Sequence, residues 1–324
     1  PTLPPHPLPA RPTRPMAKTA APRDWRWPHL AALAGGNFAL SLGPWFVRAA
    51  DTGPVSAGFW RMALALPVAA LFALWRGQPM TGHSRTMLWA MLLAGLLFAL
   101  DLAAWHWGIP RTRMGNATLF GNSGSLLLMV WGLVVARRRP HPAELAALVA
   151  ALGGAMLLLG RSASVSRETL LGDLSCMIAG FFYFGYLVLL QEARGKVGGW
   201  ALLVLSGLTA VPGMLAIALL LGEPVWPGTP TAFMHGGWAP VVVLALLSQL
   251  VGQGLLVFAL GHFRPLVVGL MLLTQPAVAV LIGWLAFNER LGPPDALGML
   301  LVAGSLVLAR VAGRDQASAE ASVG

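Results

Sequence analysis

The sequence predicts an all-α membrane protein with ten transmembrane helices, arranged as two five-helix repeats of inverted topology around a central cavity. Three observations predict this fold: the composition, the apolar runs and a repeat between the halves of the chain. Hydrophobic residues make up 56% of the chain and charged residues 10%, whereas about a quarter of a soluble domain is charged. The formal net charge of +10 lies between the apolar runs rather than on a basic helix, so we expect no nucleic-acid partner.

Ten apolar runs are long enough to be spans, because about 20 residues cross the hydrocarbon core of a bilayer. Each should be helical, since a backbone in lipid must satisfy its own hydrogen bonds. The alternating pattern of an outer-membrane barrel is absent from the sequence. The expected spans are 29–47, 55–75, 87–107, 115–136, 143–160, 171–191, 200–221, 238–260, 266–287 and 294–311.

The basic residues of the loops indicate the direction of insertion. Fifteen of the 22 Lys and Arg fall on the side that holds both chain ends, six fall on the other side, and Arg61 lies inside a span. We therefore expect both termini in the cytoplasm and the chain in a bacterial inner (plasma) membrane. Residues 1–28, rich in Pro and Arg, are interpreted as a disordered cytoplasmic tail with Met16 as a candidate start, and 312–324 as a second tail.

The two halves, 29–160 and 171–311, repeat each other. A shift of 145 residues places the string RGQP on LGEP, and it also places Pro67 on Pro212. A shift of 153 places four more residues on identical ones: Gly108 on Gly261, Trp131 on Trp284, Arg137 on Arg290 and Pro140 on Pro293. Because five spans are an odd number, the second unit crosses the membrane in the opposite sense, as in many secondary transporters.

The segment Leu266–Leu308 resembles the end of an EamA domain, the repeat of the drug/metabolite transporter (DMT) superfamily. It shares a mid-span Pro, a Glu-Arg at the span end and a Gly in the last span, in the run Pro276, Trp284, Asn288, Glu289, Arg290 and Gly298. The segment Trp105–Asn122 is similar to the same place in the first repeat. That repeat departs from the pattern, with Ala136 where Glu289 stands and Ser123 where Pro276 stands, so a role tied to these positions is asymmetric.

The resemblance implies a secondary transporter that works by alternating access and exports small metabolites or drugs from the cytoplasm. It also implies a small-molecule substrate and a surrounding of membrane lipids. An alanine ladder in 143–160, with one alanine every four residues, leaves a homodimer open. We expect no cofactor, and the single cysteine, Cys176, excludes a multi-cysteine metal site.

Two charges are expected within spans: Asp101, in the string FALDLAAWHWG, and Arg61. At about 1.5 Å of rise per residue, each lies roughly 10 Å below the outer end of its span. Intramembrane charges usually face the protein interior and pair. We expect both to flank the cavity, with Asp101 carrying a proton or binding a substrate amine and Arg61 meeting a carboxylate. The alternatives are a structural ion pair and an arginine that extends to the surface.

His106 and Trp105 follow Asp101 within a turn or two. Histidine titrates near neutral pH and suits proton coupling, whereas aromatic residues near a membrane surface commonly anchor a helix. Both residues are site candidates, and anchoring is favoured for Trp105.

Asn122 and Gln275 lie where two spans are weakened, by NSGS in 115–136 and by TQPAV in 266–287. A proline removes one helical hydrogen bond, and broken helices at matching positions of two repeats indicate a midplane binding site. Close packing through small and polar residues is the alternative.

Five further polar residues are candidates for one cavity: Asn37, Tyr183, Tyr186, Gln249 and Gln253. Gln249 and Gln253 are four apart and share a helix face. Taken singly, each is more typical of contacts between helices. Amides with aromatics suit a small zwitterion such as an amino acid, and equally other amphipathic solutes.

An enzyme is not expected, because the sequence shows neither an HExxH motif nor a pair of intramembrane carboxylates on facing helices. A passive facilitator or channel, or a lipid-handling protein, is the alternative to a coupled carrier.

Overall fold

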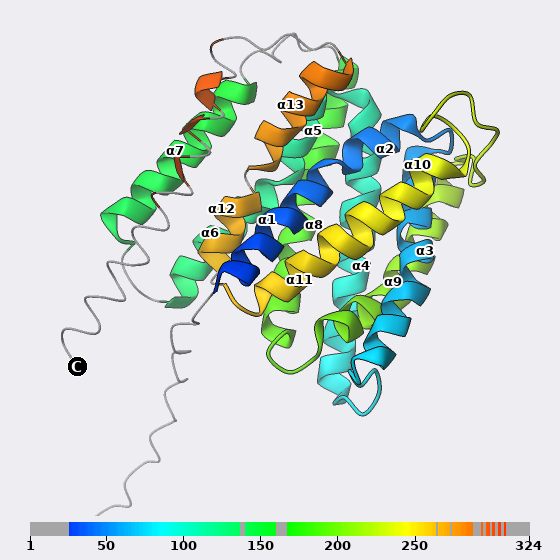
Figure 1. Ribbon diagram of the computed structural model, residues 1–324, viewed down its shortest axis with the longest axis horizontal. Coiled ribbons are helices and arrows are strands. Elements are labelled where there is room, and N and C mark those ends of the chain that lie inside the picture. The colour runs from blue at the N-terminus through cyan, green and yellow to red at the C-terminus, as the bar shows by residue number, and fades with distance from the viewer. Residues whose placement is uncertain are drawn as a thin grey trace, which may run out of the picture.

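The computed structural model describes residues 26–136, 140–159, 167–263, 265–272 and 274–287, with scattered positions between 293 and 308. Regular structure in this part of the chain is helical, apart from one isolated bridge between Ala232 and His235. The helices (Figure 1) are α1 Trp27–Ser41, α2 Gly43–Ala49, α3 Pro54–Trp75, α4 Arg85–Gly108, η1 Ile109–Arg111, α5 Met114–Gly121, α6 Ser123–Ala136, α7 Pro142–Leu159, α8 Arg167–Ala193, α9 Gly199–Leu220, α10 Trp238–Val243, η2 Leu244–Gln253, α11 Gly254–Leu260, α12 Pro265–Leu272 and α13 Gln275–Phe287.

Seven candidate membrane spans, rather than the ten expected, satisfy length and hydropathy within the described residues. Of the other expected spans, 143–160 contributes a shorter apolar helix over Pro142–Gly154 within the described residues, and 115–136 is divided into α5 and α6. The tenth, 294–311, falls largely outside the described residues, as do both tails and the Glu289–Arg290 pair. The seven are Trp27–Ala49, Pro54–Trp75, Arg85–Arg111, Leu170–Ala193, Gly199–Leu220, Trp238–Leu260 and Val267–Ala286.

Helices are interrupted at matching places in the two halves. Asn122 separates α5 from α6, and Thr274 lies between α12 and α13, immediately before Gln275. The sequence analysis predicted a weakened helix at both points. In the first half the run NSGS supplies poor helix formers, and in the second Pro276 stands at the second position of α13, where its missing N–H breaks no helical hydrogen bond.

α3 and α9 show the internal repeat most directly. Each has 22 residues and an internal proline, Pro67 or Pro212. Each is followed by a glycine with positive φ, +60° at Gly77 and +66° at Gly222, the left-handed conformation that ends many helices. The residue after each glycine then bonds back to the helix, so equivalent sequence in the two halves folds in the same way.

The start of each of these two helices is capped by a side chain that follows the other helix. The side chain of Gln78, which follows α3, accepts hydrogen bonds from the N–H groups of Trp200 and Ala201 at the start of α9. Glu223, which follows α9, accepts one from the N–H of Ser56 at the start of α3. The end of each helix therefore lies at the beginning of the other, and the pair is antiparallel.

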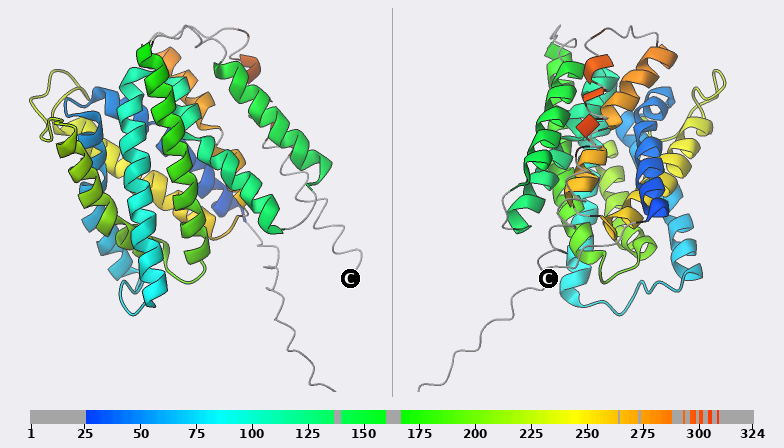
Figure 2. Two further views of the ribbon diagram at one scale, coloured as in Figure 1. Left: turned by 180° about the vertical axis from the view of Figure 1, so that it is seen from behind. Right: turned by 60° about the vertical axis from the view of Figure 1, so that its left-hand side comes forward.

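α4 is the central helix of the described bundle. Seen from behind, it lies between α8 and α9 and packs along both (Figure 2). Phe98 on α4 stacks on Tyr186 of α8, with ring centroids 4.3 Å apart, and both are fully buried. α7 lies at the edge of the bundle that is farthest from α3 and α9 (Figure 1). Residues on α4 are therefore the ones best placed to face the interior.

Candidate functional site

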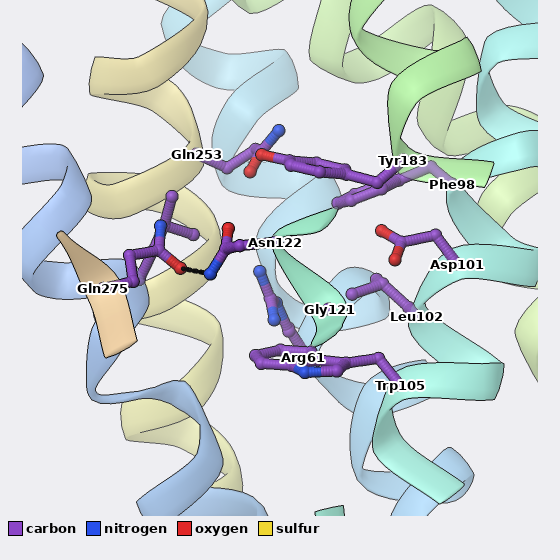
Figure 3. A pocket seen from close by; sticks show the side chains of 11 residues that line it. Arg61, Phe98, Asp101, Leu102, Trp105, Gly121, Asn122, Tyr183, Gln253 and Gln275 are labelled. Carbon is purple, nitrogen blue, oxygen red and sulfur yellow. Dashed lines mark hydrogen bonds between the residues drawn. The ribbon is translucent and has the colours of Figure 1, made fainter. Parts of the chain in front are cut away.

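A cavity with an empty volume of about 410 Å³, including its part open to solvent, lies in the middle of the bundle (Figure 3). Its walls come from α1, α3, α4 and the end of α5 in the first half, and from α8, η2 and α13 in the second. Both halves of the chain therefore contribute to it. Its lining residues are Leu40, Arg61, Phe98, Asp101, Leu102, Trp105, Gly121, Asn122, Tyr183, Gln253 and Gln275.

The two intramembrane charges face this one cavity. Arg61 is 2% exposed and Asp101 is 6% exposed, and both head groups point into the same space (Figure 3). The guanidinium Nε of Arg61 donates to Oε1 of Gln249 at 3.0 Å. Within the described part of the chain, no donor or cation lies within bonding distance of the Asp101 carboxyl. Arg61 and Asp101 are thus not a closed ion pair, and the carboxyl is available to a ligand or a proton.

A chain of amides connects α5, α13 and α1. Asn122 donates through Nδ2 to the Oε1 of Gln275 at 2.9 Å, and also to the carbonyl of Thr118 at 2.8 Å. Gln275 donates through Nε2 to Oδ1 of Asn37 at 2.9 Å, and Asn37 donates to the hydroxyl of Thr274 at 2.6 Å. The broken helices are therefore fastened to each other and to α1 by buried polar contacts.

The remaining polar walls are aromatic. Gln253 donates to the Tyr186 hydroxyl at 3.1 Å, and the ring of Tyr183 stacks beside that of Tyr186 with centroids 5.9 Å apart. Trp105 donates from its indole to the carbonyl of Ala117 at 2.9 Å. A Cβ on Gly121 would lie 2.6 Å from the same indole nitrogen, so the glycine makes room for the ring in the cavity wall.

Seven of the eleven candidates from the sequence line the cavity: Arg61, Asp101, Trp105, Asn122, Tyr183, Gln253 and Gln275. Three others lie one contact behind it, since Asn37, Tyr186 and Gln249 each bond to a lining residue. The ring of Trp105 lies in the cavity wall, where the Ala117 carbonyl of α5 accepts its indole hydrogen bond and Gly121 leaves room for it.

His106 lies apart from the cavity. Its ring nitrogen Nδ1 contacts the carbonyl of Pro54 at 2.9 Å, and the ring packs on Gly58, with the residue fully buried. It joins α4 to the start of α3.

The apolar lining residues, namely Leu40, Phe98 and Leu102, were not predicted from the sequence. An apolar residue in an apolar span carries no signal that separates a cavity wall from a lipid-facing surface.

Gln249 and Gln253 belong to a π-helical stretch, η2, which the sequence did not predict. Such stretches are rare and occur frequently at functional sites. Here the two glutamines reach different partners, Arg61 on α3 and Tyr186 on α8.

The described residues contain no group of three or more His, Cys, Asp or Glu side chains able to hold a metal ion.

A polar cavity between the two halves of a helical membrane bundle is typical of polytopic transport proteins. The EamA-like transporter family matches residues 26–160 and 170–311, so the chain belongs to that family and carries two EamA domains, as predicted. It is similar to an uncharacterized transporter of Archaeoglobus fulgidus, with 23% identity over 262 residues that cover 78% of this chain and 86% of the relative.

A solved crystal structure has a similar fold, with a TM-score of 0.70 and 18% identity over 90% of this chain and 99% of that chain. At this identity the likeness shows the fold alone. Taken together, the chain is an integral membrane protein with the general role of a transporter, in a family of transporters rather than enzymes.

Proposed function

We propose that this protein is a secondary transporter that exports a small metabolite, an amino-acid-like or amphipathic solute, across a bacterial inner membrane. The single observation that carries this proposal is the central cavity, in which a buried carboxyl without a partner among the described residues, Asp101, faces the Arg61 guanidinium. Polar groups inside a membrane bundle are expensive to bury and usually mark a substrate or ion pathway. Seven of the eleven sequence candidates line this space.

The proposed mechanism is alternating access between two inverted five-helix repeats, with ten spans in all and both termini in the cytoplasm. The antiparallel pair α3 and α9 supports the inverted arrangement, since equivalent helices then run in opposite directions. The broken helices at Asn122 and Gln275 lie at the cavity, where discontinuous helices of transporters place their binding sites. Rocking of one repeat against the other would open the cavity to each side in turn.

Protons are the proposed coupling ion, and Asp101 is the proposed carrier. A carboxyl that can exchange a proton for a substrate amine links the two fluxes, because its charge can be neutralised by only one of them at a time. No donor among the described residues engages Asp101, which supports this role.

The test is flux in liposomes that contain the purified protein, a panel of amino acids and organic cations, and an imposed pH gradient. Wild type should move at least one solute with the gradient. Asp101→Asn should abolish gradient-driven flux and retain solute exchange, because exchange needs no net proton movement. Asp173→Asn is the matched control: this carboxylate lies on α8, accepts a hydrogen bond from Thr112 and does not line the cavity.

The same assay separates the alternative functions. Saturable counterflow separates a carrier from a channel. Accumulation of solute against its gradient separates a coupled carrier from a passive facilitator. Loss of gradient-driven flux and exchange together in Asp101→Asn would contradict the proton role and favour a binding or structural role for this carboxyl.

A further inference from the structure

The guanidinium of Arg61 is held from one side only. Gln249 accepts the hydrogen bond from Nε, and in the part of the chain that the structure describes this is the one hydrogen bond that the Arg61 side chain makes. The terminal nitrogens of the guanidinium therefore remain available, and the group points into the cavity (Figure 3). An arginine fixed through Nε presents its two Nη groups as a fork.

Gln249 itself does not line the cavity, and it is 4% exposed. It acts through Arg61. The π-helix η2 brings this amide against α3, while Gln253, four residues later, lines the cavity and bonds to Tyr186. One irregular segment thus supplies both a lining residue and the support behind the buried cation.

The two Nη groups of the guanidinium favour one kind of ligand group, a planar oxyanion. A guanidinium pairs with a planar oxyanion through two parallel hydrogen bonds, which an ammonium or an amide cannot match. Asp101 in the same wall repels a second negative charge and attracts a positive one. A solute that satisfies both groups carries a carboxylate and an ammonium, with its apolar part against Phe98 and Leu102.

We propose that Gln249 is a positioning residue that aims Arg61 at the carboxylate of a zwitterionic solute. This inference rests on the proposed function and deepens it by naming the group that the cavity selects. Removal of the Gln249 acceptor frees the guanidinium to rotate, and the carboxylate then loses its bidentate partner. A hydrogen bond to a charged group is worth enough to change affinity about tenfold.

The experiment measures binding of matched probes to purified full-length protein in lipid nanodiscs, by thermal unfolding and by half-saturation of counterflow in liposomes. The probes are L-alanine, L-leucine and L-phenylalanine, the amide of each, which lacks the carboxylate, and the desamino acid of each, which lacks the ammonium. The variants are Gln249→Met, which keeps the length of the side chain without the acceptor, Arg61→Lys, and the two combined. Ser248→Ala is the control on the same π-helix, since Ser248 donates to the Ala39 carbonyl on α1.

The proposal predicts that at least one amino acid binds wild type about tenfold more tightly than its amide. Gln249→Met should weaken that amino acid about tenfold and leave the amide unchanged. In the Arg61→Lys background, which has no Nε, Gln249→Met should not weaken binding of the amino acid any further. Ser248→Ala should bind both probes as wild type does.

Three results would overturn the proposal. They are equal binding of acids and amides, an equal loss of both in Gln249→Met, and no binding of any probe. If Gln249→Met does not fold, Arg61→Lys alone decides, because it keeps the charge but lacks the fork and should therefore lower the preference for the acid; an unchanged preference would overturn the proposal. Saturable counterflow of a solute without a carboxylate would remove this inference and leave the proposed transport function in place.

Discussion

Asn122 and Gln275 are 153 positions apart in the chain and share one hydrogen bond, with Nδ2 of Asn122 2.9 Å from Oε1 of Gln275. The same shift of 153 relates Gly108 to Gly261 and Trp131 to Trp284. The two amides therefore hold equivalent places in the two EamA domains and meet each other in the cavity wall. The contact therefore joins equivalent positions of the two domains directly, one amide from each.

Removal of either amide should destabilise the protein. In Asn122→Leu or Gln275→Leu the remaining buried amide loses one of its hydrogen bonds and keeps the other, to Asn37 or to the Thr118 carbonyl, which costs about 1–3 kcal/mol. The double variant should lose less than the sum of the single ones, because both ends of one contact are then apolar. Unfolding in nanodiscs measures all three. Asn116→Ala is the control on α5, since its side-chain oxygen has no partner in the described part of the chain. Additive losses would show that the two amides do not depend on each other.

The caps of α3 and α9 give a second prediction. Gln78→Ala leaves two N–H groups at the start of α9 without an acceptor, and Glu223→Ala leaves one at the start of α3. Each change should lower the free energy of unfolding by about 1 kcal/mol. Because the caps lie at opposite ends of the helix pair, the two losses should add.

Replacement of Gln78 by a charged acceptor separates helix capping from simple contact. Gln78→Glu keeps the acceptor and places a negative charge at a helix N-terminus, which stabilises by about 0.3–1 kcal/mol. The unfolding midpoint of this variant should therefore equal or exceed that of wild type. A midpoint as low as that of Gln78→Ala would contradict capping by this side chain.

The sequence predicted most of the features that the two halves share and fewer of the contacts between helices that are distant in the chain. The match of RGQP with LGEP, the weakened spans and the polar lining residues follow from local residue types, so one sequence is enough to predict them. The caps by Gln78 and Glu223 depend on which helices pack together, and local sequence does not specify that. The π-helix could not be predicted either, because its residues would also suit an α-helix.

The separation of Arg61 from Asp101 predicts how the two charges depend on each other. Asp101→Asn leaves the Arg61 cation without its countercharge in the cavity, and Arg61→Gln leaves the carboxylate alone. An uncompensated buried charge is strongly destabilising, by about 3–5 kcal/mol where the pair is closed. Since these groups face a cavity rather than each other, we expect a loss of about 1–2 kcal/mol for each single variant, well below that limit.

The double variant, Arg61→Gln with Asp101→Asn, should recover most of the lost stability, because both charges are then removed, but it should not recover transport. Unfolding and counterflow measured side by side check this. Recovery of both would contradict a role in binding, and a further loss of stability would show that each charge has its own partners.

Glycines at helix crossings give the last prediction. Gly180 on α8 lies against the break between α5 and α6: a Cβ there would come within 2.9 Å of the Phe120 carbonyl and would collide with Ser123. Close approach of backbones through small residues stabilises helix packing in membranes. Gly180→Ala should therefore push α8 away from the broken span and lower the unfolding midpoint, at a cost of about 1–3 kcal/mol.

The same change at a glycine without a close neighbour among the described residues should act in the opposite direction. A Cβ on Gly153 of α7 meets nothing within 4 Å among the described residues, so Gly153→Ala should be neutral or stabilising by up to about 1 kcal/mol, through helix propensity alone. Comparison of the two variants in nanodiscs separates packing from propensity. If both glycines tolerate alanine equally well, α8 does not depend on close contact with the α5–α6 break, and the position of Asn122 in the cavity wall needs another support.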